Sequence, residues 1–539
     1  MLRRQFRAPQ QDGQLLAVPE LSSLSTMVTA NRHLWSSEGV SLGGMSLLQF
    51  RSLARRELVN VANQIAADWD LPPRSLSNLA GPVIMTGHQP VLTHPGVWVK
   101  NIAAAAAAAK LSGTGVNLIV DNDQSHPLEL AVPTGSIGHV RMEHVPLDDE
   151  QPALPWEERH LHNRAALDRG GETCRELVKP WGWEPLAASY WGTLRETPGF
   201  SVVQLLSRAR IVQEARWGGS NLEVPISRLS GTDSFGLFTL QLISAASQFH
   251  KLYNQAITDY RRENNVTNAG QPVPFLAGER DRYELPFWLW QEGDRQRQPL
   301  FVVRSNDVWQ LQAADISLGT VPADSAIGVE QLSLLRAALG NWKLRPRALT
   351  TTLFARLGLA DLFIHGIGGA KYDEMADQLM QEFWGLPAPA FLTLTATLRL
   401  PVEVPAISED DLRALKRQLR DLHFNPGRQL HLPEDHPYWE RKAELIAEQQ
   451  RVSASRGLNR RERRARRPQN RQRYRAFADL AASLAPQVAE RERLLRREIE
   501  RTSSLLAAKQ QLLSREVPAV LHPEERLVTL FEEVRRQIG

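Results

Sequence analysis

The chain has 539 residues, of which 42% are hydrophobic, and its formal net charge is only +4. This length allows several domains or one large domain with appendages, and the near balance of charge excludes a molecule that is polycationic throughout. A single cysteine excludes an intrachain disulfide framework and a zinc site of several cysteines, and no apolar run is long enough to cross a bilayer, so we expect a cytoplasmic protein with no membrane partner.

Residues 1–80 are expected to form an N-terminal leader followed by one helix. Residues 1–45 are typical of an extended leader. After them, apolar residues from Leu47 to Val61 recur at helical spacing, and the helix is expected to lead into Pro72-Pro73.

The next pattern is strand, polar loop, helix, strand and polar loop. The apolar run 82–86 precedes a loop at 87–96, an Ala-rich helix is predicted over 97–110, and the apolar run 116–120 leads into a second loop at 121–126. Both loops are expected at the carboxyl ends of parallel strands, where open α/β sheets bind ligands. The sequence therefore predicts a parallel α/β core over 81–400.

The first loop is a candidate site for a nucleotide or another anion. Free backbone N–H groups and the positive end of a helix dipole attract phosphate, and imidazoles can donate hydrogen bonds to its oxygens. As alternatives, the two histidines are turn residues around prolines, or they join nearby acids in a metal site, which the absence of metal-binding helical spacing disfavours. The residues assigned to the anion site are Gly87, His88, Gln89, Thr93, His94, Gly96 and, on the helix, Lys100.

The second loop supplies the candidate catalytic residues Asp121, Asp123 and His126. Carboxylates that follow a buried strand can bind a sugar hydroxyl or an amine, or can act as a general base. The equally weighted alternative is a helix N-cap with a solvated turn. No metal site is assigned to these residues.

Insertions are expected between two parts of the core, over about 131–340. Apolar residues follow helical spacing from 237 to 263, whereas short alternating runs at 300–303 and 309–311 predict antiparallel strands. The tryptophan-rich segment 285–290 is interpreted as part of an insertion.

The core sheet is expected to return at 344–349, followed by a helix over 350–357 and a strand over 361–364. A Gly-rich loop is predicted at 365–369, before another helix. Glycines there would let the backbone approach a ligand closely, although the dinucleotide fingerprint is incomplete. The alternative is tight packing between helix and strand. A strand-like run at 391–400 closes the core.

Two groups of candidate residues come from this second part of the core. Those assigned to nucleotide or anion binding are Gly366, Gly368, Gly369 and Lys371, and those assigned to substrate binding are Arg345, Arg347, His365, Tyr372 and Asp373. Cationic side chains such as Lys100, Lys371 and Arg347 would stabilise negative charge that develops at an acyl carbon or a phosphate.

Residues 401–520 change in composition toward charged residues and leucines. Helices are predicted over 410–422, 438–452 and 473–516, in an arrangement typical of an antiparallel hairpin or coiled coil. A terminal helix within 521–539 is expected to return to the core.

An Arg-rich segment at 456–467 is expected at the tip of this hairpin. It lacks interleaved aromatic residues, which favours a solvated turn or a salt-dependent protein contact. The alternative is contact with nucleic acid.

The order of these motifs resembles the bacillithiol biosynthesis cysteine-adding enzyme family. The matching positions are Gly87 and Gln89 in the first loop, Asp123 and His126 in the second, Arg345-Pro346-Arg347, and Gly368-Gly369 with Tyr372. His88 stands where the family has a glutamine, Pro95-Gly96 has the reverse order, and the acidic run of the family is broken.

The resemblance implies an α/β Rossmann-like core with connecting insertions and a C-terminal antiparallel coiled coil that forms a homodimer. It also implies a ligase that joins a cysteine-like amino acid to an amine-bearing small molecule such as an amino-sugar conjugate, with ATP or ADP as the nucleotide and no metal or organic cofactor. An amine must be neutral to attack, so Asp121 or Asp123 would act as its base.

Two functions of other classes stay open on the residues alone. One is a nucleotide-binding protein that contacts nucleic acid through the Arg-rich tip. The other is a non-catalytic scaffold that uses the coiled coil.

Overall fold

The computed structural model describes residues 6–36, 39–71, 81–136, 139–266, 268, 273–323, 326–404, 406–453 and 467–539. The chain divides into two compact units. The first comprises residues 1–132, 142–401 and 514–539, and the second comprises 133–141 and 402–513. None of the described helices is long and apolar enough to cross a membrane.

A six-stranded sheet forms the centre of the first unit, in the order β1-β16-β15-β4-β5-β8. The last five strands in this order run parallel, and β1 pairs antiparallel with β16 at one edge. The predicted α/β fold with parallel strands is therefore confirmed. The strands are β1 (Gln14–Val18), β4 (Val83–His88), β5 (Thr114–Ile119), β8 (Leu222–Pro225), β15 (Leu362–His365) and β16 (Leu392–Thr397).

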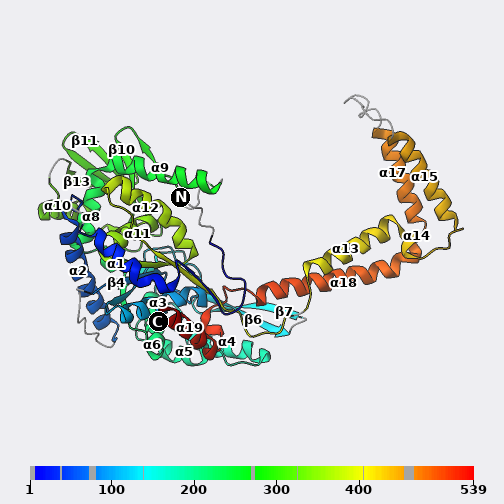
Figure 1. The fold of residues 1–539 in the computed structure, drawn as a ribbon, viewed down its shortest axis with the longest axis horizontal. Helices are drawn as coiled ribbons and strands as arrows, with labels where there is room; N and C mark the ends of the chain where they lie inside the picture. The colour runs from blue at the N-terminus through cyan, green and yellow to red at the C-terminus, as the bar shows by residue number, and fades with distance from the viewer. Residues whose placement is uncertain are drawn as a thin grey trace. The chain divides into compact units, whose positions relative to one another are not determined.

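Helices surround this sheet, and Figure 1 shows α19 beside α3 and α12 beside α9. Strands β4 and β5 are buried along most of their length, which is typical of parallel strands covered on both faces. The helices of the first unit are α1 (Leu24–Leu34), α2 (Leu47–Asp68), α3 (Pro95–Lys110), α4 (Arg164–Val178), α5 (Ala187–Glu196), α6 (Val202–Arg216), α7 (Ile226–Leu229), α8 (Asp233–Ser244), α9 (Ala246–Asn264), α10 (Val329–Leu339), α11 (Ala348–Phe354), α12 (Ile367–Trp384) and α19 (Glu524–Ile538).

A second, antiparallel sheet lies in the same unit, in the order β13-β12-β11-β10-β14, with β9 paired to β10. It contains the two strands that the sequence predicts near residues 300 and 310. Its strands are β9 (Gly278–Glu279), β10 (Arg282–Trp290), β11 (Gln298–Ser305), β12 (Val308–Ala313), β13 (Ile316–Pro322) and β14 (Lys343–Pro346). Two small pairs, β2 (Ser41–Leu42) with β3 (Met45–Ser46) and β6 (Glu129–Ser136) with β7 (His139–Pro146), complete the strands.

Several sequence-based expectations about single elements are wrong. Residues 1–45 contain β1 and α1 and are not an extended leader, because β1 pairs with the distant β16 and Asn31 of α1 donates to the Asp361 carbonyl at 2.7 Å. The helix predicted over 237–263 breaks at Ala245, whose φ of −110° and ψ of 31° are not helical. The spacing of apolar residues along the sequence shows neither the pairing of distant strands nor a break at one residue within a helix.

The segment 344–349 does not rejoin the main sheet. Its residues Lys343–Pro346 form β14, which pairs with β10 of the second sheet. The tryptophan-rich segment 285–290 is part of that strand β10. A short strand such as β14 could belong to either sheet, so the sequence pattern could not show which strand it pairs with.

The described part of the second unit is helical apart from residues 133–136 and 139–141, which belong to β6 and β7. Helix α13 (Glu409–Phe424) packs on α18 (Ala485–Leu512), and α15 (Pro437–Ser453) packs on α17 (Arg467–Ala482), as Figure 1 shows. A short helix, α14 (Pro426–Gln429), follows α13. The helix predicted over 473–516 is interrupted between α17 and α18, just before Pro486. Residues 456–466 of the Arg-rich segment, and the side chain of Arg467, lie outside the described residues.

Gly96 marks a close approach between α3 and β16. A Cβ atom there would lie 2.4 Å from the Ala396 carbonyl oxygen, whereas the same position at Gly368 in α12 has no heavy atom within 4 Å. We expect Gly96→Ala to lower the free energy of unfolding by about 1–3 kcal/mol through overpacking. Gly368→Ala should raise it by up to about 1 kcal/mol through helix propensity. Urea unfolding measures both values, and equal destabilisation by the two substitutions would contradict this packing.

Candidate functional site

Asp121 lies two residues after the end of β5 and is 2% exposed. Its carboxylate accepts a hydrogen bond from the Ser227 backbone N–H at 2.9 Å and another from the Ser227 hydroxyl. Ser227 lies in α7, which directly follows β8. Because β5 and β8 are neighbouring parallel strands, their carboxyl ends bring the two residues together.

Glu157 brings a second carboxylate close to Asp121. Its backbone N–H donates to the Asp121 carbonyl oxygen at 2.7 Å, in the 3-10 turn Trp156–Glu158. Its side chain forms a two-pronged ion pair with Arg345 of β14, in which both N···O distances are 2.8 Å. Such a bidentate pair fixes the guanidinium in one orientation.

The environment raises the pKa of Asp121 from 3.8 to about 7. Burial is the main cause, because it removes the water that would solvate the carboxylate, and the negative charge of Glu157 adds to it. The hydrogen bonds from Ser227 and the charge of Arg345 oppose the rise without cancelling it. A carboxyl group with this pKa can accept and release a proton at neutral pH.

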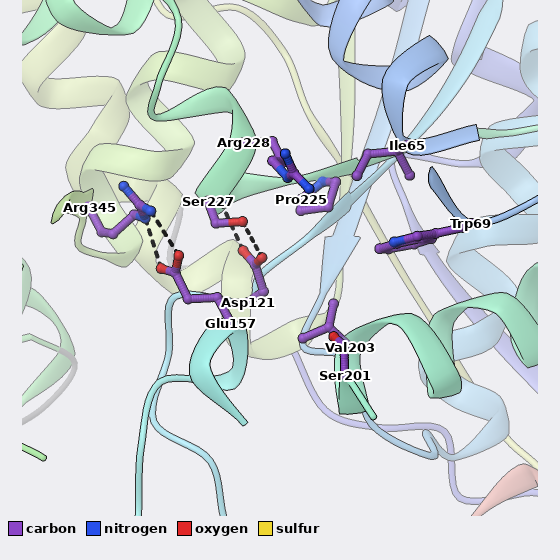
Figure 2. Close-up of a pocket in the computed structure, with 10 residues that line it drawn as sticks. All are labelled: Ile65, Trp69, Asp121, Glu157, Ser201, Val203, Pro225, Ser227, Arg228 and Arg345. Atoms are coloured by element: carbon purple, nitrogen blue, oxygen red, sulfur yellow. Dashed lines mark hydrogen bonds and ion pairs between the residues drawn. The ribbon is translucent and has the colours of Figure 1, made fainter. Parts of the chain in front are cut away.

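A cavity of about 270 Å³ opens at Asp121. Figure 2 shows Arg345 and Glu157 at one side of it, Trp69 and Ile65 at the other, and Asp121 with Ser227 between them. This volume suits a small molecule or one end of a larger one. The lining residues are Ile65, Trp69, Asp121, Glu157, Ser201, Val203, Pro225, Ser227, Arg228 and Arg345.

The raised pKa of Asp121 makes stability depend on pH. The folded state binds this proton more tightly than the unfolded state, so the free energy of unfolding should fall as pH rises from 3.8 to about 7. Asp121→Asn removes this dependence. We therefore expect the variant to gain stability relative to the wild type when both are unfolded in urea at pH 8 instead of pH 5. The same difference at both pH values would show that Asp121 does not carry this shift.

The first loop is more compact than expected, because β4 extends to His88 and α3 begins at Pro95. His94 is the N-cap of α3, and its Nδ1 accepts the Gly96 N–H at 3.1 Å. Lys100 folds back and donates from Nζ to the Gly87 carbonyl at 2.8 Å. Two of the candidate anion contacts are therefore engaged within the loop itself.

Burial governs the titration of this loop. It lowers the pKa of His88 to about 3, with the charge of Lys100 adding to the effect, and lowers the pKa of Lys100 itself to about 8. The pKa of His94 falls to about 4 through burial and the charge of Arg515. Both imidazoles are therefore neutral at pH 7, so either can offer one N–H donor but no positive charge.

Asp123 joins the first loop to the second. Its carboxylate accepts from the Gln89 side chain at 2.6 Å and lies 3.3 Å from Arg297. Asp123 does not line the cavity at Asp121. His126 is also outside that lining and is exposed, and its ring centroid lies 5.1 Å from that of Trp156 with the two rings nearly perpendicular. Of the three candidate catalytic residues, Asp121 alone belongs to the cavity lining.

The Gly-rich loop predicted at 365–369 is shorter than expected, because α12 begins at Ile367 with Gly366 as its N-cap. Gly368 and Gly369 are therefore helical. A Cβ at Gly369 would lie 2.8 Å from His365 Nδ1. This contact favours the alternative that the glycine permits tight packing of helix on strand.

The remaining candidates separate into different surroundings. His365 is 6% exposed and its Nε2 contacts the Asp373 carboxylate, which also lies 3.2 Å from Arg356. Arg347 pairs with Glu284 at 2.6 Å, away from the Asp121 cavity lining. Lys371 is exposed on α12, and the side chain of Tyr372 lies outside the described residues. Thr93 instead lines a small cavity with His88 and Gln89.

Sequence reasoning missed most of the side chains around Asp121. Glu157 and Ser227 lie in the segment interpreted as an insertion, and Trp69 lies at the end of α2. One weak signal was present for Ser227, because the short segment Leu222–Pro225, which is apolar except for Glu223, ends two residues before it and forms a buried strand.

A comparison with protein-family models finds none that matches the chain, and a comparison with curated proteins finds no match either.

Proposed function

We propose that the cavity at Asp121 is the active site of a ligase that condenses a cysteine-like amino acid with an amine-bearing small molecule, such as an amino-sugar conjugate. The observation that carries this proposal is the buried Asp121 carboxyl group with a pKa of about 7, lining a cavity of about 270 Å³. A base of this strength suits removal of a proton from an attacking amine near neutral pH.

In the proposed reaction the carboxylate of the amino acid is first phosphorylated by ATP, which releases ADP. The amine nitrogen then forms a bond to the acyl carbon, and phosphate leaves. Asp121 takes the proton that the nitrogen loses, and Ser227 holds the carboxylate in place through its two hydrogen bonds. The Arg345 guanidinium, fixed by Glu157, lies at the same cavity and would stabilise negative charge on the acyl group.

We propose that the phosphates of ATP bind at the start of α3, where the helix dipole favours anions. His94 now accepts the Gly96 N–H that a phosphate would need. Nucleotide binding there thus requires the His94 imidazole to turn away, after which its N–H can donate to a phosphate oxygen.

Thermal denaturation of the purified chain with ATP or ADP tests the nucleotide part of this proposal. We expect the nucleotide to raise the melting temperature of the wild type but not of the His88→Ala, His94→Ala double variant, each compared with its own ligand-free value. His126→Ala, at an exposed histidine, is the matched control and should respond as the wild type does. A shift of equal size in the double variant would contradict a site at α3.

The chain order of the parallel strands supports a Rossmann-like core as part of this proposal. Starting at β4, the chain adds β5 and β8 on one side and β15 and β16 on the other. This reversal creates a crevice at the carboxyl ends of the strands, where such folds bind nucleotides.

We also propose that the second unit is a coiled coil through which the protein forms a homodimer. The apolar cluster of Leu422, Val488 and Leu495 supports helix pairing within the unit. Ile446, Tyr474 and Leu494 stay exposed on its helices and would be available to a second copy. Contact with nucleic acid, the scaffold role and the cytoplasmic location stay predictions.

A further inference from the structure

A second cavity, of about 320 Å³, lies in the first unit between α8, α10 and β14. Its apolar side chains come from both helices and from the residues that precede and form β14. They are Phe235, Leu332, Leu335, Leu339, Trp342 and Leu344. Leu332 and Leu335 are 3% and 2% exposed and form an apolar floor, whereas Leu339 and Trp342 are half-buried.

The charged side chains that line this second cavity are all cationic. They are Arg336, Lys343 and Arg345, and no carboxylate belongs to the lining. All three cations have an acidic partner: Arg336 pairs with Asp233 at 2.6 Å, Lys343 with Glu158 at 2.5 Å, and Arg345 with Glu157. None of these acids lines the cavity. An apolar floor with cations at its edge favours a ligand with an apolar body and a negative charge.

Arg345 lines both cavities. Its guanidinium is 12% exposed and is fixed by the two-pronged pair with Glu157. Asp121 and Ser227 line the first cavity, the apolar floor belongs to the second, and Arg345 is common to both linings. A carboxylic acid whose carboxylate contacts Arg345 would place its apolar part in the second cavity. Its carboxyl carbon would then lie toward Asp121.

We propose that the second cavity binds the acyl donor of the condensation, the cysteine-like amino acid, through its carboxylate and the apolar part of its side chain. The assignment rests on the proposed function, since it gives the cavity at Asp121 to the amine. The donor carboxylate contacts Arg345, and its apolar part packs on Leu332, Leu335 and Leu339. The amine then approaches the carboxyl carbon from the side of Asp121.

Direct binding of simple acids to the full chain tests this proposal without any turnover. The probes are acetate, butanoate and hexanoate, with hexanamide as the uncharged analogue, and the measurement is isothermal titration calorimetry. Each methylene that enters the cavity should tighten binding about three- to fourfold. Hexanamide should bind at least tenfold more weakly than hexanoate, because it brings no charge to the cationic edge.

Two tryptophan substitutions on α10 show where the probes bind. Leu339→Trp fills the cavity from its edge and should weaken hexanoate binding at least tenfold. Leu334→Trp, on the same helix but 39% exposed and outside the lining, should leave it unchanged. Trp342→Ala provides a second test if Leu339→Trp does not fold. This variant should show a smaller increase in affinity for each methylene added to the acid.

The proposal would be overturned if affinity did not rise from acetate to hexanoate, or if hexanoate bound Leu339→Trp and the wild type equally well. Failure of the proposed function would look different, since hexanoate would still bind while no condensation product formed with any amine.

Discussion

Asp121→Asn is expected to slow condensation by about 10²–10⁴-fold, the usual contribution of a positioned general base. Asparagine has nearly the same shape, and its carbonyl oxygen can still accept one of the two Ser227 hydrogen bonds while its amide donates to the Ser227 hydroxyl oxygen, but it cannot take a proton. The loss should appear in kcat, with the KM for the amine changed little. Steady-state assays of ADP release, with circular dichroism to check folding, measure this.

Asp123→Asn is the comparison that separates the two carboxylates of the same loop. Asp123 is half-exposed, contacts Gln89 and Arg297, and is absent from the cavity lining. We expect its replacement to lower kcat by less than tenfold. A larger loss of kcat in Asp123→Asn than in Asp121→Asn would show that Asp121 is not the base.

Asp361→Ala is expected to give the largest loss of stability. The Asp361 carboxylate is fully buried and lies 2.9 Å from Arg51 and 2.6 Å from Arg55. It also accepts hydrogen bonds from Trp35 and from the Val83 backbone N–H, both at 2.9 Å. Its removal leaves two guanidinium groups without their buried counter-ion, which costs about 3–5 kcal/mol.

The pKa of Asp361 adds a dependence on pH. Burial alone would raise this pKa, but the charges of Arg55 and Arg51 outweigh it and hold the pKa below its usual 3.8. A lowered pKa in the folded state contributes stability above pH 3.8 that is lost as the pH falls through the folded value. The cost of Asp361→Ala should therefore be largest near neutral pH and should shrink in strong acid.

Asp315→Ala is the control for an exposed ion pair in the same unit. Asp315 is 97% exposed and lies 3.1 Å from Arg282, so its loss should change stability by less than about 1 kcal/mol. Urea unfolding of both variants gives the comparison. Equal losses at Asp361 and Asp315 would contradict the structural role of the buried cluster.

The sequence predicts the main sheet well where apolar runs are followed by polar loops. Residues 83–88, 114–119, 362–365 and 392–397 all form strands close to the expected runs. Fully buried parallel strands lack polar alternation, so their length and their flanking loops are visible without tertiary information. The partner of β14 was not visible, because pairing with β10 depends on contacts far away in the sequence.

The candidate site could be predicted only in part for the same reason. Asp121 was found because it follows a strand, and Arg345 because of a short motif. Glu157 and Ser227 come from segments without a recognisable pattern, and only the fold brings them next to Asp121. The Gly-rich segment shows the opposite case, in which a suggestive local pattern is explained by packing of Gly369 on His365.

One assay tests the central claim most directly. The purified chain is incubated with ATP, isotope-labelled cysteine and a set of amino-sugar conjugates, and the products are followed by mass spectrometry together with ADP release. The account predicts a labelled product whose mass is the sum of the two substrates minus one water, with one ADP per product, and its loss in Asp121→Asn. A folded wild-type protein that gives no such product, or an Asp121→Asn variant that forms it at the wild-type rate, would contradict the account.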